Sequence, residues 1–396
     1  MQITPECPEL SSSTELAPRI TVIFAIQALH SGGAEKQLLL IARYLAEAGF
    51  SCAIVTLGST PRHPRIQKLV NDALAAGVEL HEPNRSGSLT IQILKLAKTV
   101  RASGRSILWS WGTRADVVCK IFARLYPKVM LVCSLRSADS ERIRKLRHVE
   151  NLFAALVCRY VSNSWANCEQ LNEVVPNVLP RCRVIYNCLA PEELSQPALQ
   201  LPITPNPLRI VMLGNIRPII KGYDYVIELA EVIRREALPI LITIAGREIE
   251  SDWLQTRIRD RRIGTVLEYH GEAPDPYAFL RTGHLFLLMS RIEGTPNALL
   301  EAMNLGMPCI STKVGDIARF TTDKVNIRQV EIGDVRAVIE VLKDFLCDWS
   351  LGIRIGSAAR ALCAKEFTAP RMAENVRSLI NELVADRSLE KMQCSV

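Results

Sequence analysis

The sequence predicts an α/β fold of two doubly wound domains that face a central cleft. The chain has 396 residues, which is too many for one ordinary core and about right for two. Short apolar, β-branched segments alternate with helical patterns in both halves, which is typical of parallel sheets covered by helices on both faces. A proline-rich stretch at 191–207 interrupts the alternation, and we interpret it as an interdomain linker.

The first domain is expected at 19–190, after a leader at 1–18. The leader is acidic and contains prolines, without the basic start and apolar run of a secretory signal, so we expect it to be disordered. Helical patterns are clearest at Glu35–Ala48 and Leu89–Ala102. The expected strands are Ile20–Ala25, Cys52–Leu57, Ile107–Trp111, Val129–Cys133 and Leu156–Val161.

The second domain is expected at 208–368, followed by a tail at 369–396 whose amphipathic pattern at Ala369–Val384 predicts a helix. Because ligands of open α/β sheets bind beyond the carboxyl ends of strands, the cleft between the domains is the expected site. The expected strands are Leu208–Leu213, Pro239–Ala245, Val266–Tyr269, His284–Met289 and Pro308–Thr312. The expected helices are Gly222–Arg235, Asp252–Arg261, Pro276–Arg281, Ala298–Leu305 and Val335–Leu346.

The composition and charge of the chain argue against several classes of protein. A hydrophobic fraction of 48% and a charged fraction of 22% argue against disorder and coiled coil. Residues 1–190 hold 23 Lys and Arg against 14 Asp and Glu, so the net charge of +7 resides in the first half, most densely at Arg136–Arg147. This positive charge can bind phosphate groups or an anionic membrane face. A helix face that is simply exposed to water explains it equally well. A nucleic-acid binder is disfavoured because the basic stretch lacks interleaved aromatic residues.

The cysteines and the apolar runs point to the cytoplasm. Several of the twelve cysteines fall inside apolar runs, and none forms a Cys-x-x-Cys pair, so we expect reduced, buried thiols and no zinc site. No apolar run reaches the roughly 18–20 residues that span a bilayer. We therefore expect a cytoplasmic protein that can lie peripherally on the inner membrane face.

A glycine-containing turn follows the first expected strand and opens a helix. Within His30–Lys36, Gly32 and Gly33 allow close backbone approach, and the helix start offers unpaired amides to an anion. The turn lacks the spacing of a dinucleotide fingerprint. A simple tight strand-to-helix turn explains it at least as well.

Two cations follow the first strand of the second half. Arg217 and Lys221 lie between Gly214 and Gly222, in a loop expected at the carboxyl end of that strand. An Arg fork and a Lys point charge can together neutralise a diphosphate. The alternative is a pair of solvated surface cations, which their position after a strand makes less favoured.

The most specific pattern follows the strand His284–Met289. Gly294, Thr295, Pro296 and Asn297 form a turn into a short helix, whose free amides would point into the cleft. Glu293 precedes this helix, and Glu301 lies eight residues further on, within an apolar stretch where an unpaired carboxylate is costly. Carboxylates suit pairs of hydroxyl groups, so we expect one to face a sugar and the other a ribose.

These residues resemble glycosyltransferase family 4, the retaining enzymes of the GT-B fold, in which two Rossmann-like domains face each other. The resemblance extends from about Thr21 to Ala385 and is most specific at Glu293–Glu301. The Gly-Gly-Ala-Glu turn, Val184–Asn187, the Arg217 and Lys221 loop, and Thr312–Asp316 are similar to further family elements and occur in the family's order.

The resemblance implies a UDP- or GDP-sugar donor, no metal and no further cofactor, and a glycan or lipid-linked acceptor. Arg217 and Lys221 would bind the diphosphate, Glu293 the transferred sugar and Glu301 the ribose. Gly33 would let the first domain's loop approach the donor phosphate or the acceptor. The last helix would return to the first domain.

Two departures from the family accompany these similarities. Many relatives place a His that contacts the donor sugar where this chain has Leu135-Arg136, so Arg136 is a candidate contact to donor sugar or acceptor. The diphosphate loop is one residue longer than in many relatives. A nucleotide-sugar epimerase and a catalytically silent sugar-nucleotide-binding subunit are the alternatives on this fold.

Overall fold

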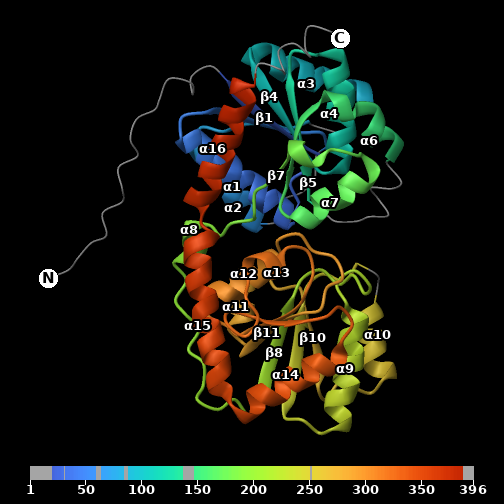
Figure 1. Ribbon diagram of the computed structural model, residues 1–396, viewed down its shortest axis with the longest axis vertical. Coiled ribbons are helices and arrows are strands. Elements are labelled where there is room, and N and C mark those ends of the chain that lie inside the picture. The colour runs from blue at the N-terminus through green and yellow to red at the C-terminus, as the bar shows by residue number, and fades with distance from the viewer. Residues whose placement is uncertain are drawn as a thin grey trace, which may run out of the picture.

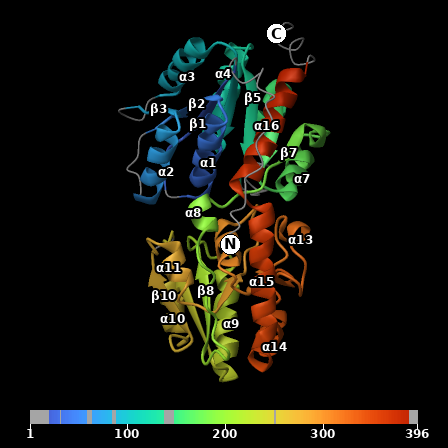
Figure 2. The ribbon, with the colours of Figure 1, turned by 90° about the vertical axis from the view of Figure 1, so that its left-hand side faces the viewer.

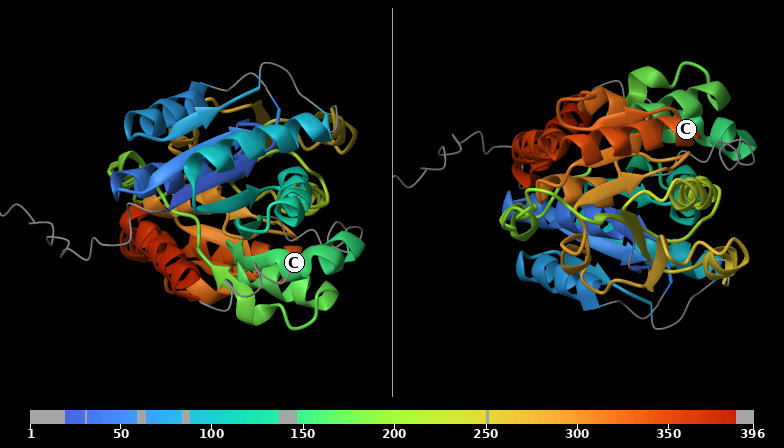
Figure 3. Two further views of the ribbon diagram at one scale, coloured as in Figure 1. Left: turned by 90° about the horizontal axis from the view of Figure 1, so that it is seen from above. Right: turned by 90° about the horizontal axis from the view of Figure 1, so that it is seen from below.

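The computed structural model describes residues 20–30, 32–58, 64–83, 88–136, 147–249 and 252–386. The expected leader and most of the basic stretch Arg136–Arg147 therefore lie outside the described residues. Two α/β domains are stacked along the long axis of the molecule (Figure 1). Seen from either end, helices lie on both sides of the strands (Figure 3).

The first domain contains a seven-stranded parallel sheet in the order β3-β2-β1-β4-β5-β6-β7. β1 pairs with β2 on one side and with β4 on the other, so the strand order reverses at β1 and opens a crevice at its carboxyl end. The strands are β1 (Thr21–Ile26), β2 (Ser51–Thr56), β3 (Glu79–His81), β4 (Ser106–Trp111), β5 (Met130–Leu135), β6 (Val157–Ser162) and β7 (Cys182–Val184).

Continuous apolar runs form these strands because both faces of the sheet are buried. Val22 and Phe24 pack under α1, α2 and the last helix, α16 (Ala369–Ala385), whereas Ile23 and Ala25 face α3, α4 and α7. The helices are α1 (Gly33–Glu47), α2 (Pro64–Ala75), α3 (Leu89–Ser103), α4 (Thr113–Leu125), α6 (Arg147–Phe153), α7 (Trp165–Val174) and α8 (Pro191–Leu194), with 3-10 turns η2 (Ala154–Leu156) and η3 (Leu179–Arg181).

The second domain repeats this plan with a six-stranded parallel sheet in the order β10-β9-β8-β11-β12-β13. Its strand order reverses at β8, which pairs with β9 and β11. The strands are β8 (Leu208–Leu213), β9 (Ile240–Ala245), β10 (Leu267–Gly271), β11 (Leu285–Leu288), β12 (Cys309–Thr312) and β13 (Arg328–Val330). Its helices are α9 (Tyr223–Arg235), α10 (Trp253–Asp260), α11 (Pro276–Leu280), α12 (Asn297–Asn304), α13 (Ile317–Phe320), α14 (Val335–Cys347) and α15 (Trp349–Glu366).

The chain crosses between the domains twice, and the two crossings lie side by side. Leu189 donates a backbone hydrogen bond to the carbonyl of Phe367 at 2.9 Å and forms a parallel bridge with Thr368. α15 runs along the second domain, and α16 continues beyond it along the first (Figure 2). Met372, Val376 and other apolar residues of α16 belong to the core under β1, so the last helix packs on the first domain.

Candidate functional site

A cavity of about 510 Å³ lies between the domains, where the loops at the carboxyl ends of both sheets meet. Its described lining includes the start of α1, the loop after β8 and the turn into α12. Cationic side chains outnumber carboxylates in this lining, so the cavity favours an anionic ligand. The cations are Lys36, Arg65, Arg136, Arg217, Lys221 and Arg247, and the carboxylates are Glu272, Glu293 and Glu301.

Glycines allow the two domains to approach closely at the cavity. A Cβ on Gly33 would lie 2.2 Å from Nδ2 of Asn297 in the second domain. A Cβ on Gly294 would lie 2.3 Å from Oδ1 of Asn163 in the first domain. Both distances are too short for a side chain, so each glycine makes room for an asparagine of the opposite domain. Gly32 also lines the cavity, together with Gly33.

The loop after β8 brings Arg217 and Lys221, the two side chains expected to bind a diphosphate, to the cavity. Lys221 Nζ lies 2.5 Å from Glu293 Oε1, which also accepts a hydrogen bond of 2.8 Å from Ser290 Oγ. Arg217 is exposed at the cavity and pairs with no carboxylate of the described residues. Gly214 also lines the cavity, and its carbonyl accepts a bond of 2.9 Å from Tyr223 Oη.

The turn into α12 presents a helix N-terminus to the same space. Pro296 is the N-cap, and Asn297 and Ala298 of the first turn line the cavity. The first amides of a helix have no intrahelical acceptor, so this end carries a partial positive charge. Thr295 Oγ1 donates to the Asn163 carbonyl at 2.5 Å, which anchors the turn on the first domain.

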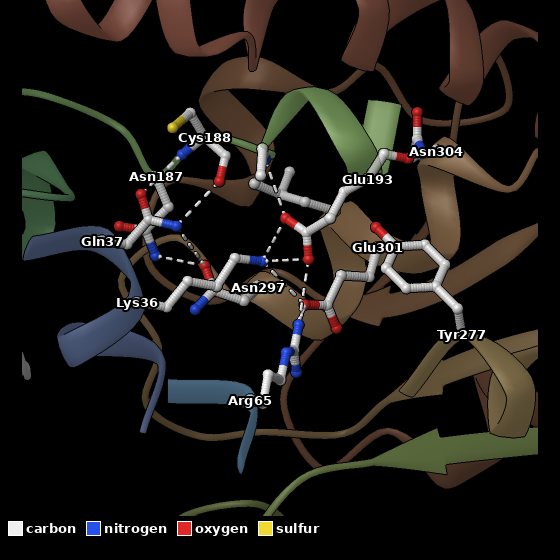
Figure 4. A network of polar contacts seen from close by, with 12 residues as sticks. Lys36, Gln37, Arg65, Asn187, Cys188, Glu193, Tyr277, Asn297, Glu301 and Asn304 are labelled. Carbon is white, nitrogen blue, oxygen red and sulfur yellow. Dashed lines mark hydrogen bonds and ion pairs between the residues drawn. The ribbon is translucent and has the colours of Figure 1, made fainter. Parts of the chain in front are cut away.

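Glu301 lies in a cluster of four charges that joins the domains, and Glu301 and Lys36 are its buried members (Figure 4). Lys36 Nζ from α1 lies 3.1 Å from Glu301 Oε1 and 2.6 Å from Glu193 Oε2 of α8. Arg65 Nη2 from α2 lies 3.0 Å from Glu301 Oε1 and 3.1 Å from Glu193 Oε1. Two cations thus balance two carboxylates, which offsets the cost of burying Lys36, Glu193 and Glu301, whereas the Arg65 side chain keeps 36% of its surface exposed.

The charges of this cluster shift each other's pKa. Burial alone would raise the pKa of Glu301, but Lys36 and Arg65 outweigh it, and the pKa is held below its ordinary value. Burial would likewise lower the pKa of Lys36, but Glu301 and Glu193 raise it overall. Glu301 is therefore ionised at neutral pH. Its Oε1 is occupied by both cations, whereas its Oε2 has no hydrogen-bond partner among the described residues.

Amide side chains continue the interdomain network next to this cluster (Figure 4). Asn187 Nδ2 donates to the Thr295 carbonyl at 2.7 Å and to Asn297 Oδ1 at 3.0 Å. Gln37 Nε2 donates to Asn297 Oδ1 at 3.2 Å and to the Cys188 carbonyl at 2.9 Å. The first crossing segment is therefore bonded to α1 and to the turn before α12 at once.

A second interdomain contact involves the expected element Thr312–Asp316. Asp316 accepts backbone hydrogen bonds from Trp165 at 2.7 Å and Ala166 at 3.2 Å, in the first turn of α7. Tyr186 Oη donates to the same carboxylate at 3.0 Å. A carboxylate of the second domain therefore satisfies the amide end of a helix in the first.

Arg136 projects into the cavity from the loop after β5. Its guanidinium lies over the ring of Trp111, with the central carbon 3.9 Å from the ring centroid. Nη1 lies 3.3 Å from Asn187 Oδ1, and burial lowers the pKa of this guanidinium to about 9, so it is charged at neutral pH.

The structure also brings in residues that the motifs did not single out. Lys36 lies inside the Gly-Gly-Ala-Glu-Lys turn, but its charge had no assigned partner. Arg65 and Glu193 fall outside every motif, and Glu193 belongs to a stretch interpreted as linker. The sequence contains one indication of these cations: Glu301 lies within an apolar run, and a carboxylate buried there needs a partner of opposite charge.

Two further features concern metals and membranes. Within the described ranges, no group of three or more His, Cys, Asp or Glu side chains is arranged to hold a metal ion. No helix in those ranges combines the length and apolar character needed to cross a membrane. The ten cysteines in those ranges are unpaired, and nine of them are buried.

The second domain matches a known family. Residues 199–362 fit the sequence profile described as "Glycosyl transferases group 1". N-acetyl-alpha-D-glucosaminyl L-malate synthase of Bacillus anthracis is 21% identical over 304 residues, covering 74% of this chain and 78% of that protein. These matches support the conclusion that the chain is a glycosyltransferase.

A second relative and a solved structure extend the comparison. The N-acetylgalactosamine-N,N'-diacetylbacillosaminyl-diphospho-undecaprenol 4-alpha-N-acetylgalactosaminyltransferase of Campylobacter jejuni is 24% identical, over 54% of this chain and 57% of its own length. Anabaena Alr3699/HepE, solved in complex with UDP and glucose, superimposes with a TM-score of 0.74 and 17% identity, over 91% of this chain and 99% of that one. This likeness confirms the expected GT-B fold of two Rossmann-like domains.

Proposed function

We propose that this chain is a retaining glycosyltransferase that moves a sugar from a UDP- or GDP-sugar to a glycan or lipid-linked acceptor in cell-surface polysaccharide synthesis. One observation carries the proposal: Arg217, Lys221 and the amide end of α12 converge on a single interdomain cavity. A nucleotide diphosphate is the ligand whose charge this arrangement complements.

The cavity suits the charge that develops as the donor breaks. Cleavage of the bond between the anomeric carbon and the phosphate oxygen leaves negative charge on the diphosphate. Arg217 and Lys221 lie in one loop beside the α12 end, so fixed cations and amides can stabilise that charge. We assign Arg217, Lys221 and Glu293 to the reacting groups, with Gly214, Gly294, Thr295, Pro296 and Asn297 shaping the donor pocket.

The two glutamates suit the donor's hydroxyl groups. Each has one carboxylate oxygen fixed by cations, Glu293 by Lys221 and Glu301 by Lys36 and Arg65. The second oxygen of Glu301 is left to accept hydrogen bonds, and we assign it to the ribose. Glu293, which is nearer to the Lys221 loop, is assigned to the transferred sugar.

Retention follows from attack on the face that the diphosphate leaves. The acceptor oxygen forms a bond to the anomeric carbon as the bond to phosphate breaks, and the departing phosphate oxygen takes the acceptor's proton. No side-chain nucleophile is required in this scheme. The transfer remains balanced, since the products are the glycosylated acceptor and the protonated nucleotide.

The acceptor assignment draws on the relatives. The Campylobacter protein is named for a diphospho-undecaprenol acceptor, and lipid-linked acceptors require access to a membrane face. On this chain, exposed apolar residues Leu89, Ile91 and Leu94 lie on α3 of the more basic domain, and Trp165 is partly exposed at the start of α7. We propose a cytoplasmic protein that contacts the anionic inner membrane face peripherally.

A ligand screen followed by product analysis tests the function. The purified chain is screened for thermal stabilisation by UDP-, GDP- and ADP-sugars, and the best donor is incubated with and without an acceptor panel that includes undecaprenyl-diphosphate sugars. A glycosyltransferase forms a new glycoside only with acceptor. Conversion of the sugar nucleotide alone would identify an epimerase, and binding without any turnover would identify a silent subunit.

A further inference from the structure

Arg136 is a half-buried cation whose guanidinium nitrogens Nε and Nη2 are buried and not neutralised by the described surroundings. Among the described residues, its Nε and Nη2 are shielded from solvent and have no hydrogen-bond partner, and no carboxylate pairs with it. Within the described ranges, its guanidinium lies over the face of Trp111 and forms a long hydrogen bond with Asn187. A buried charge without a partner is costly, so a fold retains one only where something offsets the cost.

The other cations in the described cavity lining differ from Arg136. Lys36 and Arg65 are balanced by Glu193 and Glu301, and Lys221 is paired with Glu293. Arg217 and Arg247 are exposed, so water solvates them. Arg136 alone among these six has buried donor atoms and neither a carboxylate nor water to receive them.

The two unbonded nitrogens of Arg136, Nε and Nη2, indicate which chemical group can bind to them. Nε and Nη2 form one edge of the planar guanidinium, and their N–H bonds point in parallel. That edge matches two oxygens of a carboxylate or a phosphate, which bind arginine in this bidentate way. Hydroxyl groups of a neutral sugar could occupy the same donors but would leave the charge uncompensated.

We propose that Arg136 binds an anionic group, a carboxylate or a phosphate, that belongs to the transferred sugar or to the acceptor and not to the nucleotide diphosphate. Arg136 lies on the wall formed by the first domain, whereas Arg217 and Lys221 lie on the wall formed by the second. The inference rests on the proposed glycosyl transfer and adds the chemical class of the second ligand. The two sources are a uronic acid as the donor sugar and an acid group on the acceptor.

Calorimetry with matched neutral and acidic ligands tests the proposal. The wild-type chain is titrated with UDP and with two matched pairs of a neutral and an acidic donor: UDP-glucose with UDP-glucuronate, and UDP-galactose with UDP-galacturonate. If the chain prefers GDP, the matched pair is GDP-mannose with GDP-mannuronate. The UDP- or GDP-saturated protein is then titrated with malonate and with inorganic phosphate. The same titrations are run on Arg136→Met and on Arg124→Met, which removes an exposed cation of α4.

We expect the wild-type protein to bind the acidic ligand about tenfold or more tightly than its neutral counterpart, either in the donor titrations or in the titrations of the nucleotide-saturated protein. A charge-assisted pair of hydrogen bonds provides a difference of this size. A uronate donor preference identifies the donor sugar as the source, and binding of malonate or phosphate to the nucleotide-saturated protein identifies the acceptor. Arg136→Met should abolish that preference while the affinity for free nucleotide stays within about twofold, and Arg124→Met should behave as wild type.

Two results overturn the proposal: no acid preference in any arm of the wild-type protein, or a loss of free-nucleotide affinity in Arg136→Met as large as the loss for the acidic ligands. If Arg136→Met does not fold, the wild-type comparison still decides, because it needs no variant. Failure of every nucleotide to bind would instead count against the proposed function itself.

Discussion

Lys36 on the first helix of the chain and Glu301 on α12 of the second domain form a buried ion pair across the interdomain cavity, with Nζ and Oε1 3.1 Å apart. They are separated by 265 positions in sequence. The pair holds one oxygen of Glu301 and orients the other, so it couples the geometry of the proposed donor pocket to the packing of the domains.

Removing one member of this pair should destabilise the protein. Lys36→Met leaves two buried carboxylates with only Arg65 between them, and an uncompensated buried charge costs about 3 kcal/mol. We expect urea unfolding to show this loss. As a control, Lys365→Met, at an exposed position of α15, should change stability by less than about 0.5 kcal/mol. A loss in Lys36→Met no larger than in the control would mean that the cluster does not stabilise the fold.

The same cluster predicts a pH dependence with a definite sign. The pKa of Glu301 is lowered on folding, so its contribution to stability is present above the unfolded value, near 4.5, and is lost as the pH falls through the lower folded value. Glu301→Gln lacks this titration. The difference between the melting temperatures of the two proteins, measured from pH 7 to pH 3, should therefore shrink as the pH falls below about 4.5. A constant difference over this range would contradict the lowered pKa.

Most strands were predictable because each of them is largely an apolar run, and their expected and observed bounds differ by a few residues at most. The sequence did not predict β3, β7 and β13, which are three residues long and too short for a periodic signal. α15 was also missed, although it is 18 residues long, because Gly352 and Gly356 interrupt its helical pattern.

Within the site, sequence position identified the loops but not the contacts between domains. Glu293 and Glu301 could be found because carboxylates are unexpected beside apolar runs. The cationic partners of Glu301 could not be assigned, since Lys36 and Arg65 lie more than 200 positions away from it in the chain. Tertiary approach determines such pairs, and no local pattern specifies it.

Close packing at Gly33 should make it intolerant of a methyl group. A Cβ there would clash with the amide of Asn297, so Gly33→Ala must either displace that side chain from its bonds with Gln37 and Asn187 or push apart α1 and α12. We expect a stability loss of about 1–3 kcal/mol and a lower kcat/KM for glycosyl transfer. Gly264→Ala is the matched control, because its Cβ would meet Ile258 at an ordinary 3.7 Å. Equal behaviour of the two variants would exclude the interdomain clash.

Lys221 provides the sharpest test of the assigned chemistry. If its ammonium stabilises the departing diphosphate, Lys221→Ala should lower the transfer rate by about 10²-fold, the usual loss for one group that stabilises transition-state charge. Because Lys221 is only partly buried and its pair with Glu293 is local, the fold should be retained. Single-turnover rates at saturating donor separate this effect from weaker binding. Lys365→Ala removes an exposed lysine of the same domain and should leave the rate unchanged, whereas near-normal turnover in Lys221→Ala would remove Lys221 from the mechanism.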